Sequence, residues 1–425
     1  MDLSTYMVTK KESIRDIEVK PRMIEVNENK NFIISVIGPR RAGKTYFLYD
    51  LMRRRGLSDE SYLFLNFEEP VDVRSLDEAV TAHYEIYGSE PVYVFLDEIQ
   101  AFPGWEKHVY SLYERKRHFI FLTGSSSKLL AREIATQLRG RSLPTYVYPF
   151  SFKEILRISG IAEEKLYSLY AESKMRHLLQ TCLRKGFFPD IVLGNSEPHK
   201  FFREYLDLVI YKDIIERFGL RNRHALEYFI ESCISSNAST FSVHKVYNSL
   251  KSQGIKVSKK TLYNFQRILE DVSFGIFLRK YERSRRKIEL SMPKFYLIDN
   301  GIYTYFEGEN LGRLMENIVL LELLKAGFMP NREVFYWKSL RGEEVDFVLE
   351  TSTGLKLIQA TYASGRDEVN KREIYSLVKA AKALGTKNLE VVTWQLEESL
   401  EIDGEKIFFK PLWKWILSLS SPLKH

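Results

Sequence analysis

Gly38-Pro39-Arg40-Arg41-Ala42-Gly43-Lys44-Thr45 is the most informative stretch of this chain. It follows an apolar run, residues 32–37, and precedes a helical pattern, residues 46–52. Glycines allow consecutive backbone N–H groups to converge on an anion without Cβ clashes, and a helix that begins at Lys44 adds the positive end of its dipole. The succession of strand, glycine loop, Lys-Thr and helix therefore predicts a phosphate-binding loop.

The motif assigns roles to its own residues. Lys44 is expected to reach the β- and γ-phosphates of ATP, and the Thr45 hydroxyl to hold Mg²⁺. A chance match in a glycine turn is the alternative, and the strand before the loop and the helix after it argue against that alternative. The residues predicted to bind the nucleotide are Gly38, Pro39, Arg40, Arg41, Ala42, Gly43, Lys44, Thr45 and Tyr46.

Composition limits the class of protein. The 425 residues suffice for two or three domains, and 44% apolar with 28% charged residues is typical of a folded, soluble protein. A formal net charge of +7 favours an acidic partner such as nucleic acid, but on so long a chain it is weak support alone. Cys182 and Cys233 have no Cys or His at ligand spacing, so neither a zinc site nor a disulfide framework is predicted. Scarce cysteine, no signal core and no membrane-length apolar run predict a cytoplasmic protein without membrane contact.

Five apolar runs separated by helical segments predict the core of the first domain. Such runs indicate strands buried on both faces of an α/β sheet. The charged, helix-prone residues before about position 30 predict a lead-in helix against this core. The runs are residues 32–37, 62–66, 92–96, 119–122 and 145–148.

The third run is followed by Asp97-Glu98. An acid pair at the carboxyl end of a strand, in a chain that also has a phosphate loop, is the second motif of nucleotide hydrolases. Asp97 is predicted to complete the Mg²⁺ shell, and Glu98 to orient and deprotonate the attacking water. The alternative is a strand that happens to end in two acids. The acid at position 98 argues for hydrolysis rather than nucleotide binding alone.

The fourth run ends in a hydroxyl-rich segment, residues 123–127. A hydroxyl at the tip of the strand beside the Asp97 strand is placed to sense the γ-phosphate, and Thr123 and Ser125 are equal candidates. The simpler explanation is a polar turn that caps the following helix, residues 128–138, and both explanations can hold together.

Two arginines follow, Arg139 and Arg141. An arginine that reaches the γ-phosphate neutralises charge in the transition state and is worth about 10³–10⁵ in rate. Either residue is a candidate, within one chain or across the interface of a homo-oligomer. Surface arginines paired with acids are an equally weighted alternative.

The loop, the Asp97-Glu98 segment, residues 122–130 and residues 138–154 together resemble a prokaryotic family of AAA-type predicted ATPases. The resemblance covers nearly the whole chain. It implies ATP and Mg²⁺ as cofactors, a winged-helix region and a C-terminal restriction-endonuclease-like domain of the PD-(D/E)XK type, while the family's biological role is poorly defined. One family segment usually carries Arg where this chain has Lys212, which keeps the charge but loses the bidentate fork.

A helix-turn-helix pattern occupies the middle of the chain. An apolar stripe over residues 243–250, a break at Gly254 and a second helix capped by Ser258 form its core. With a basic segment, residues 279–287, and strand-like residues 288–290, the pattern predicts a winged helix that contacts double-stranded DNA. A small helical domain with a solvated hairpin, or a protein-docking winged helix, are alternatives. The residues predicted to contact DNA are Lys260, Asn264, Arg267, Arg283, Arg285, Arg286 and Lys287.

The C-terminal pattern is helix, three strands, helix, strand, the layout of restriction-endonuclease-like nucleases. Such sites need an Asp and a Glu-x-Lys, and here Asp346 supplies the Asp while Glu316 is an accessory acid. Gln359 and Thr361 replace the Glu and the Lys, so a catalytically inactive nuclease-like domain is predicted. The expected elements are a helix at 311–326, strands at 334–337, 345–349 and 355–360, a helix at 366–384 and a strand at 389–393.

These patterns predict an α/β chain with four regions: a P-loop ATPase core (1–150), a helical lid (151–230), a winged helix (231–300) and a nuclease-like domain (301–425). The leading hypothesis is Mg²⁺-dependent ATP hydrolysis coupled to DNA or protein handling. A slow-turnover, ATP-controlled binding switch is the second hypothesis, and an ATP-regulated nuclease is the third.

Overall fold

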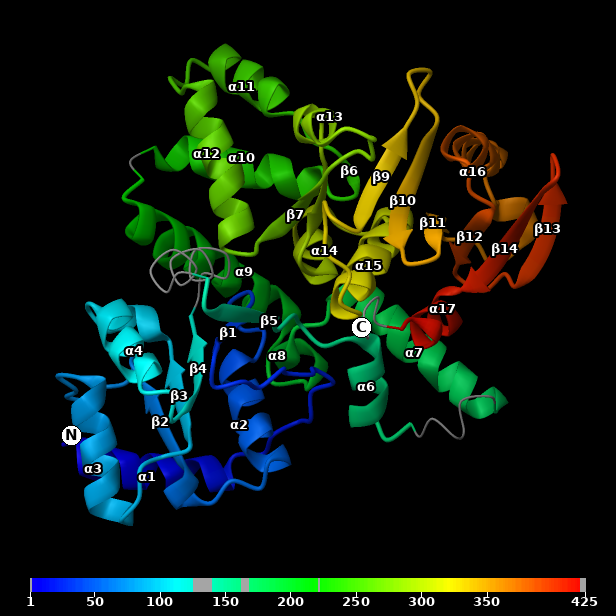
Figure 1. The fold of residues 1–425 in the computed structure, drawn as a ribbon. Helices are drawn as coiled ribbons and strands as arrows, with labels where there is room; N and C mark the ends of the chain where they lie inside the picture. Colours follow the sequence, from blue (N-terminus) through cyan, green and yellow to red (C-terminus); the bar gives the residue numbers. More distant parts are fainter. Residues whose placement is uncertain (1, 125–139, 162–167, 221, 421–425) are drawn as a thin grey trace. The chain divides into compact units, whose positions relative to one another are not determined.

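The computed structural model describes residues 2–124, 140–161, 168–220 and 222–420 (Figure 1). The chain divides into two compact units. The first consists of Met1–Phe150 with Asp271–Ser273, and the second of Ser151–Glu270 with Phe274–His425.

The first unit is built on a five-stranded sheet in the order β2-β3-β4-β1-β5, with every neighbouring pair parallel. Because β4 lies between β1 and β3, the residues after β1, β3 and β4 meet at one edge of the sheet. This confirms the predicted parallel α/β sheet. The strands are β1 (Ile33–Ile37), β2 (Tyr62–Asn66), β3 (Tyr93–Asp97), β4 (Phe119–Thr123) and β5 (Ser142–Tyr146).

Helices cover both faces of this sheet. Ile34 and Val36 of β1 pack with α2 (Lys44–Arg54), whereas Ile33 and Ile37 point to the face covered by two other helices. This alternation follows from the two-residue repeat of a strand. The other two are α3 (Leu76–Tyr87) and α4 (Trp105–Glu114), and the predicted lead-in helix is α1 (Leu3–Asp16), which packs along β2 and α3.

The predicted position of β5 was wrong by three residues. The expected strand was 145–148, but the ladder with β1 begins at Ser142 and ends at Tyr146. β5 is an edge strand that is only half-buried, so it lacks the continuous apolar run that marked the central strands. Val147, which is fully buried, dominated the sequence signal although it lies just beyond the strand.

The second unit begins with helices, as predicted for residues 151–230. The last of them before α10 is a π-helix of eight residues, η4, which contains Lys212 as an exposed side chain. The helices are α6 (Phe152–Ile158), α7 (Leu169–Lys185), α8 (Pro189–Val192), α9 (Pro198–Leu208), η4 (Val209–Glu216) and α10 (Arg223–Ser235).

A small antiparallel sheet, ordered β6-β8-β7, follows α10. The predicted pair of helices around Gly254 is confirmed, but the strand-like reading of Ile288 to Leu290 was wrong, because these residues close a short helix. The strand-like pairing of this connection is made earlier, by Tyr281, whose N–H donates to the Tyr336 carbonyl at 2.6 Å. The elements are β6 (Ser239–Thr240), α11 (Val243–Ser252), α12 (Lys259–Asp271), β7 (Gly275–Leu278), α13 (Arg285–Leu290) and β8 (Lys294–Leu297).

A six-stranded mixed sheet, ordered β13-β14-β12-β11-β10-β9, forms the C-terminal part. The expected order of helix, three strands, helix and strand is confirmed, but β13 and β14 were missed. β13 is an edge strand and β14 lies between β13 and β12. In both strands more exposed residues alternate with more buried ones, so neither contains a continuous buried run. The elements are α14 (Asn300–Glu307), α15 (Leu311–Lys325), β9 (Val334–Lys338), β10 (Glu344–Thr351), β11 (Gly354–Thr361), α16 (Lys371–Leu384), β12 (Asn388–Thr393), β13 (Glu398–Ile402), β14 (Glu405–Pro411) and α17 (Leu412–Ser418).

Candidate functional site

The loop between β1 and α2 has a backbone that only a few residue types tolerate. A Cβ atom on Gly38 would lie 2.0 Å from the Val147 carbonyl oxygen, so this position accepts no side chain. Gly43, the N-cap of α2, has φ 88°, and Arg41 has φ 61°, both in the left-handed region. Left-handed residues within a short loop turn backbone N–H groups toward a common point, which is the geometry of an anion nest.

Lys44 folds back over this loop. Its ammonium donates to the carbonyls of Gly38 at 3.3 Å and Pro39 at 3.2 Å, and the residue is only 6% exposed. A buried cation above converging N–H groups fits a phosphate chain, because phosphate oxygens accept hydrogen bonds from both. The remaining predicted nucleotide-binding residue, Tyr46, lies in the first turn of α2 and is half exposed.

Arg22 supports the phosphate loop through hydrogen bonds, and the sequence analysis did not predict this residue. Its guanidinium donates to the carbonyls of Ala42 at 3.0 Å and Tyr148 at 2.7 Å, and it lies over the Phe150 ring. Its backbone N–H donates to Asp50 of α2. Arg22 follows Lys20-Pro21 in a segment without regular structure, so no periodic pattern marked it.

Asp97 is the centre of the acidic side of the site. It is fully buried at the end of β3, and its two carboxylate oxygens accept from two hydroxyls, Thr45 at 2.8 Å and Thr123. The Thr123 hydroxyl in turn accepts from the Glu98 N–H at 2.9 Å. The strand order places the carboxyl ends of β1, β4 and β3 together. This chain of hydrogen bonds connects the start of α2, which follows the loop after β1, to the ends of β3 and β4.

The electrostatics of Asp97 reflect this burial. Desolvation and the neighbouring Glu98 raise the pKa of Asp97 to about 6, against the opposing effect of the two hydroxyls and Lys44. A cation bound at this carboxylate would favour its ionised form and offset the desolvation. Carboxylate and hydroxyl oxygens are ligands that Mg²⁺ accepts, so Asp97 and Thr45 fit this ion.

Glu98 is held in an unusual conformation. Its backbone is left-handed, with φ 50° and ψ 47°, which for a residue other than glycine costs of order 1–3 kcal/mol. Its carboxylate accepts a hydrogen bond from the Gln100 amide at 2.6 Å. The Thr123 hydroxyl fixes its backbone and Gln100 fixes its carboxylate, so the side chain is oriented at both ends. The sequence analysis gave Gln100 no role.

The arginine candidates are not brought to this edge. Arg141 immediately precedes β5, and β5 runs parallel to β1. Arg141 therefore lies at the amino-terminal end of the strands, whereas the phosphate loop follows their carboxyl-terminal end, and a five-residue strand separates the two ends by about 16 Å. Its guanidinium pairs with Glu114 of α4. A role for Arg141 within its own chain is therefore not supported by the geometry. Arg139 and Ser125 lie outside the described residues.

The predicted DNA contacts on α12 share one face of the helix. Lys260 and Arg267 are exposed and Asn264 is half-buried, while Leu262, Phe265 and Leu269 are buried beneath them. Tyr263, which the sequence analysis did not select, stands on the exposed side at 58% exposure. The outer face of α12 therefore presents two cations and an aromatic ring.

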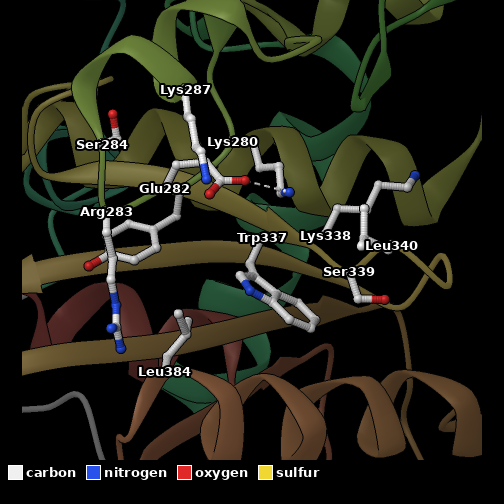
Figure 2. A pocket seen from close by; sticks show the side chains of 11 residues that line it. Lys280, Glu282, Arg283, Ser284, Lys287, Trp337, Lys338, Ser339, Leu340 and Leu384 are labelled. Atoms are coloured by element: carbon white, nitrogen blue, oxygen red, sulfur yellow. Dashed lines mark hydrogen bonds and ion pairs between the residues drawn. The ribbon is translucent and has the colours of Figure 1, made fainter.

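Two members of the second group of predicted contacts, Arg283 and Lys287, line a cavity of about 360 Å³ next to the β7–β8 connection (Figure 2). Lys280 is paired with Glu282 at 2.7 Å, whereas Arg283 and Lys287 are exposed and belong to none of the ion pairs found among the described residues. Figure 2 shows the Trp337 ring in the middle of this cavity. Arg285 and Arg286 are exposed in α13.

The described residues hold no group of three His, Cys, Asp or Glu side chains arranged to bind a metal. Within the same residues, no helix is long and apolar enough to cross a membrane. Cys182 and Cys233 are buried free thiols, and burial raises the pKa of both.

Comparison with known proteins identifies the first unit. Residues 30–156 match the family model described as an AAA domain. Residues 176–312 and 311–415 match two models described as domains of unknown function, DUF8612 and DUF4143. The AAA match contains the phosphate loop and the Asp97-Glu98 segment, so the chain carries an AAA-type ATPase fold.

Among solved structures, the Walker-type ATPase PABY2304 of Pyrococcus abyssi is 15% identical, with 69% of this chain and 99% of that chain covered and a TM-score of 0.40. The Orc1 protein of Aeropyrum pernix, solved in complex with DNA, is 14% identical, with 76% and 93% covered and a TM-score of 0.29.

Two curated relatives extend over nearly the whole chain. An uncharacterized protein of Haemophilus influenzae is 26% identical, with 91% of this chain and 95% of the relative covered. The uncharacterized protein MJ1544 of Methanocaldococcus jannaschii is 34% identical, with 98% of this chain and 94% of the relative covered. At that identity and coverage, the chain belongs to the protein family of MJ1544.

Proposed function

We propose that the first unit hydrolyses ATP with Mg²⁺. The observation that carries the proposal is the hydrogen-bonded chain Thr45–Asp97–Thr123–Glu98 N–H beside the loop that Lys44 covers. Mg²⁺ bound by Thr45 and Asp97 would neutralise charge on the β- and γ-phosphates. Lys44 and the loop N–H groups hold the phosphate chain in place.

Glu98 is the residue proposed to activate water. Its carboxylate follows the buried Asp97 directly, and Gln100 and Thr123 restrict its orientation. A positioned general base contributes when it lies within hydrogen-bonding reach of the water and keeps a fixed direction. Thr123 connects this base to the proposed metal ligand through two hydrogen bonds.

Steady-state phosphate release tests this assignment. Glu98→Gln is expected to lower turnover by roughly 10²- to 10⁴-fold while ATP binding is kept, because only the base is lost. Glu85→Gln, an exposed position on α3, is the matched control and is expected to retain parental turnover. Phosphate release by Glu98→Gln at the parental rate would remove the catalytic role of Glu98.

We also propose that the second unit binds double-stranded DNA through a winged helix formed by α10, α11, α12 and the sheet β6-β8-β7. Three helices followed by an antiparallel pair is the order of such a module, with α12 as the recognition helix. Support comes from the exposed Lys260, Tyr263 and Arg267 on α12 and from the basic β7–β8 connection. The cations would neutralise phosphates, so affinity is expected to fall steeply with salt.

Charge reversal separates this contact from general electrostatic attraction. Arg285→Glu/Arg286→Glu is expected to weaken binding to duplex DNA and to reduce the dependence of affinity on salt. Lys371→Glu/Arg372→Glu, at an exposed helix start in the same unit, changes the net charge equally and serves as the control. If both double variants and the parent bind duplex DNA with equal affinity at low salt, α13 does not contact DNA.

A second candidate function is a slow-turnover switch in which ATP mainly controls partner binding. The position of Arg141 favours the switch, because this arginine lies at the end of the strands away from the phosphate loop and pairs with Glu114. A copy that lacks an arginine at its own γ-phosphate would turn over slowly until a second copy supplied one. Turnover per chain that rises with protein concentration supports assembly-dependent hydrolysis, and constant slow turnover supports the switch.

A further inference from the structure

Lys294 is a buried cation surrounded by three carboxylates in the second unit. Its ammonium lies 2.6 Å from Glu316, 2.9 Å from Glu344 and 3.2 Å from Asp346, and its side chain is 2% exposed. The four residues come from β8, α15 and β10. Burial alone would lower the pKa of Lys294, but the surrounding acids outweigh burial and raise that pKa well above its ordinary value.

This cluster occupies the place where the nuclease-like pattern calls for Mg²⁺. Glu316 and Asp346 are the two acids that the sequence analysis assigned to that site, while Gln359 and Thr361 stand where an acid and a lysine were expected. Lys294 was not foreseen, because it lies on β8, outside the C-terminal sheet and 52 positions before Asp346.

The carboxylate oxygens of the cluster are directed at protein donors. The Asp346 Oδ2 atom accepts from the Gln359 amide at 2.6 Å and from the Ala360 N–H at 3.0 Å, and its Oδ1 atom accepts from Lys294. The Glu316 Oε1 atom accepts from Lys294 and from the Tyr296 hydroxyl at 2.6 Å. Mg²⁺ requires several oxygen ligands at about 2.0–2.1 Å in octahedral geometry, and the ammonium fills the position between these acids.

Acids remain in excess around the lysine. Glu344 also pairs with Lys338 at 2.7 Å. Burial, and to a smaller extent the charge of Asp346, raise the pKa of Glu373 of α16 to about 7. Two lysines therefore face four acids here. A second cation of charge +2 would meet the Lys294 ammonium at contact distance, and the repulsion between them disfavours its binding.

We infer that the Lys294 ammonium takes the place of a divalent cation in this acidic cluster. The site is closed by the chain itself, and it holds strand β8 of the small sheet against α15 and β10 of the C-terminal part. Removal of Lys294 leaves Glu316, Glu344 and Asp346 with a vacant cation position. The inference does not depend on the proposed ATPase or DNA-binding functions.

The test compares metal binding by the nucleotide-free parent and by Lys294→Ala, with Mn²⁺ as the probe. Titration followed by the electron paramagnetic resonance of free Mn²⁺ is expected to show one additional bound ion in the variant. Lys294→Ala/Asp346→Asn is expected to lose that ion again. Lys338→Ala, which removes the more exposed lysine beside Glu344, is the matched control and is expected to bind as the parent does.

Thermal unfolding supplies a second readout. Lys294→Ala is expected to lower Tm by roughly 5–15 °C, because a buried charge cluster loses its counter-ion. Millimolar Mg²⁺ or Mn²⁺ is expected to restore at least half of that loss, and to leave the Tm of the nucleotide-free parent within about 1 °C, since only a site that binds the ion gains stability from it.

Three outcomes would overturn the inference. They are a folded Lys294→Ala variant that binds no additional Mn²⁺, a parent whose bound Mn²⁺ disappears in Asp346→Asn, and parental Mn²⁺ binding lost on Lys294→Ala. Where Lys294→Ala does not fold, the variant Lys294→Met/Glu316→Gln/Asp346→Asn, which removes the charges of all three residues, tests the inference instead. It is expected to fold and to bind no Mn²⁺ at this site, and failure of that variant to fold would contradict a purely ionic role for Lys294.

Discussion

At the scale of single residues, the nucleotide site depends on one buried carboxylate. Asp97 connects the helix that follows the phosphate loop, through Thr45, to the tip of β4, through Thr123. The sequence predicted that Asp97 and Glu98 stand at the end of a strand, because an acid pair after an apolar run is a local pattern. Their roles stay predictions. The sequence left Thr123 and Ser125 equal, and the hydrogen bonds of Thr123 now favour that residue among the described ones.

Thr123→Val removes the hydroxyl that joins the two acids while keeping the side-chain shape. Loss of such a supporting hydrogen bond is expected to lower kcat roughly 10- to 100-fold, with a smaller change in the affinity for ATP. Phosphate release and nucleotide binding measure the two effects separately. Thr81→Val, an exposed position on α3, should behave as the parent, and a Thr123→Val enzyme with unchanged kcat would argue that the hydroxyl only caps the strand.

Asp299 gives a pH dependence of stability. Burial raises the pKa of Asp299 to about 6, although the N–H groups of Phe187 and Gly301 and the charge of Lys325 oppose that rise. In the unfolded chain the carboxyl titrates near 3.8. The folded state therefore binds the proton more tightly, and the free energy of unfolding falls as pH rises from about 4 to 6, by of order 1–3 kcal/mol from this group.

Chemical unfolding of the parent and Asp299→Asn over this pH range measures the effect. The stability of the parent relative to the variant is expected to decline between pH 4 and 6 and to level off above pH 6. A difference that grows with pH, or that stays constant, would show that folding does not raise the pKa of Asp299.

At the scale of elements, Gly38, which follows β1, is constrained by the backbone just beyond the end of β5. Gly38→Ala would place its Cβ atom 2.0 Å from the Val147 carbonyl oxygen. This oxygen belongs to the backbone directly after β5, so it cannot move away without disturbing the pairing of β5 with β1. We expect a destabilisation of about 1–3 kcal/mol together with loss of nucleotide binding.

Gly312→Ala is the matched control for Gly38→Ala, because its nearest atom would be 3.7 Å away and its backbone is not left-handed. Thermal unfolding and nucleotide binding are the measurements. Tight ATP binding by Gly38→Ala at parental stability would mean that the loop has room for a side chain.

Elements with a strong local pattern were predicted from the sequence, and elements defined by their neighbours were not. Strands β1 to β4 are nearly continuous apolar runs and were found within one residue at each end. The edge strands β5 and β13, and β14 beside β13, contain no continuous buried run and were shifted or missed. α13 was misassigned because its Ile288 packs into the core of the C-terminal sheet, a long-range contact that no local pattern contains.

Long-range contacts also explain which site residues the sequence could not reveal. Arg22 acts on carbonyls that lie 20 and 126 positions later, and Lys294 acts on acids of α15 and β10. The distance of Arg141 from the loop of its own chain was likewise not predictable, because it depends on the direction of β5.

At the scale of the whole molecule, an arginine supplied by a second copy predicts complementation. Glu98→Gln keeps Arg141, and Arg141→Ala keeps Glu98. If Arg141 acts between copies, a mixture of the two inactive variants is expected to recover about a quarter of the parental turnover, from random pairing of subunits. Phosphate release by the mixture, alongside its mass in solution, measures this. A mixture no more active than its components would exclude exchange of Arg141 between copies.

The central claim is that this AAA-type chain hydrolyses ATP at the Lys44–Asp97–Glu98 site and couples hydrolysis to DNA. Steady-state phosphate release with Mg²⁺ at low salt, with and without duplex DNA, tests it most directly. Duplex DNA is expected to stimulate phosphate release by the parent but not by Arg285→Glu/Arg286→Glu. Glu98→Gln is expected to abolish turnover. Parental phosphate release no faster than that of Glu98→Gln, in the presence or absence of DNA, would contradict the claim.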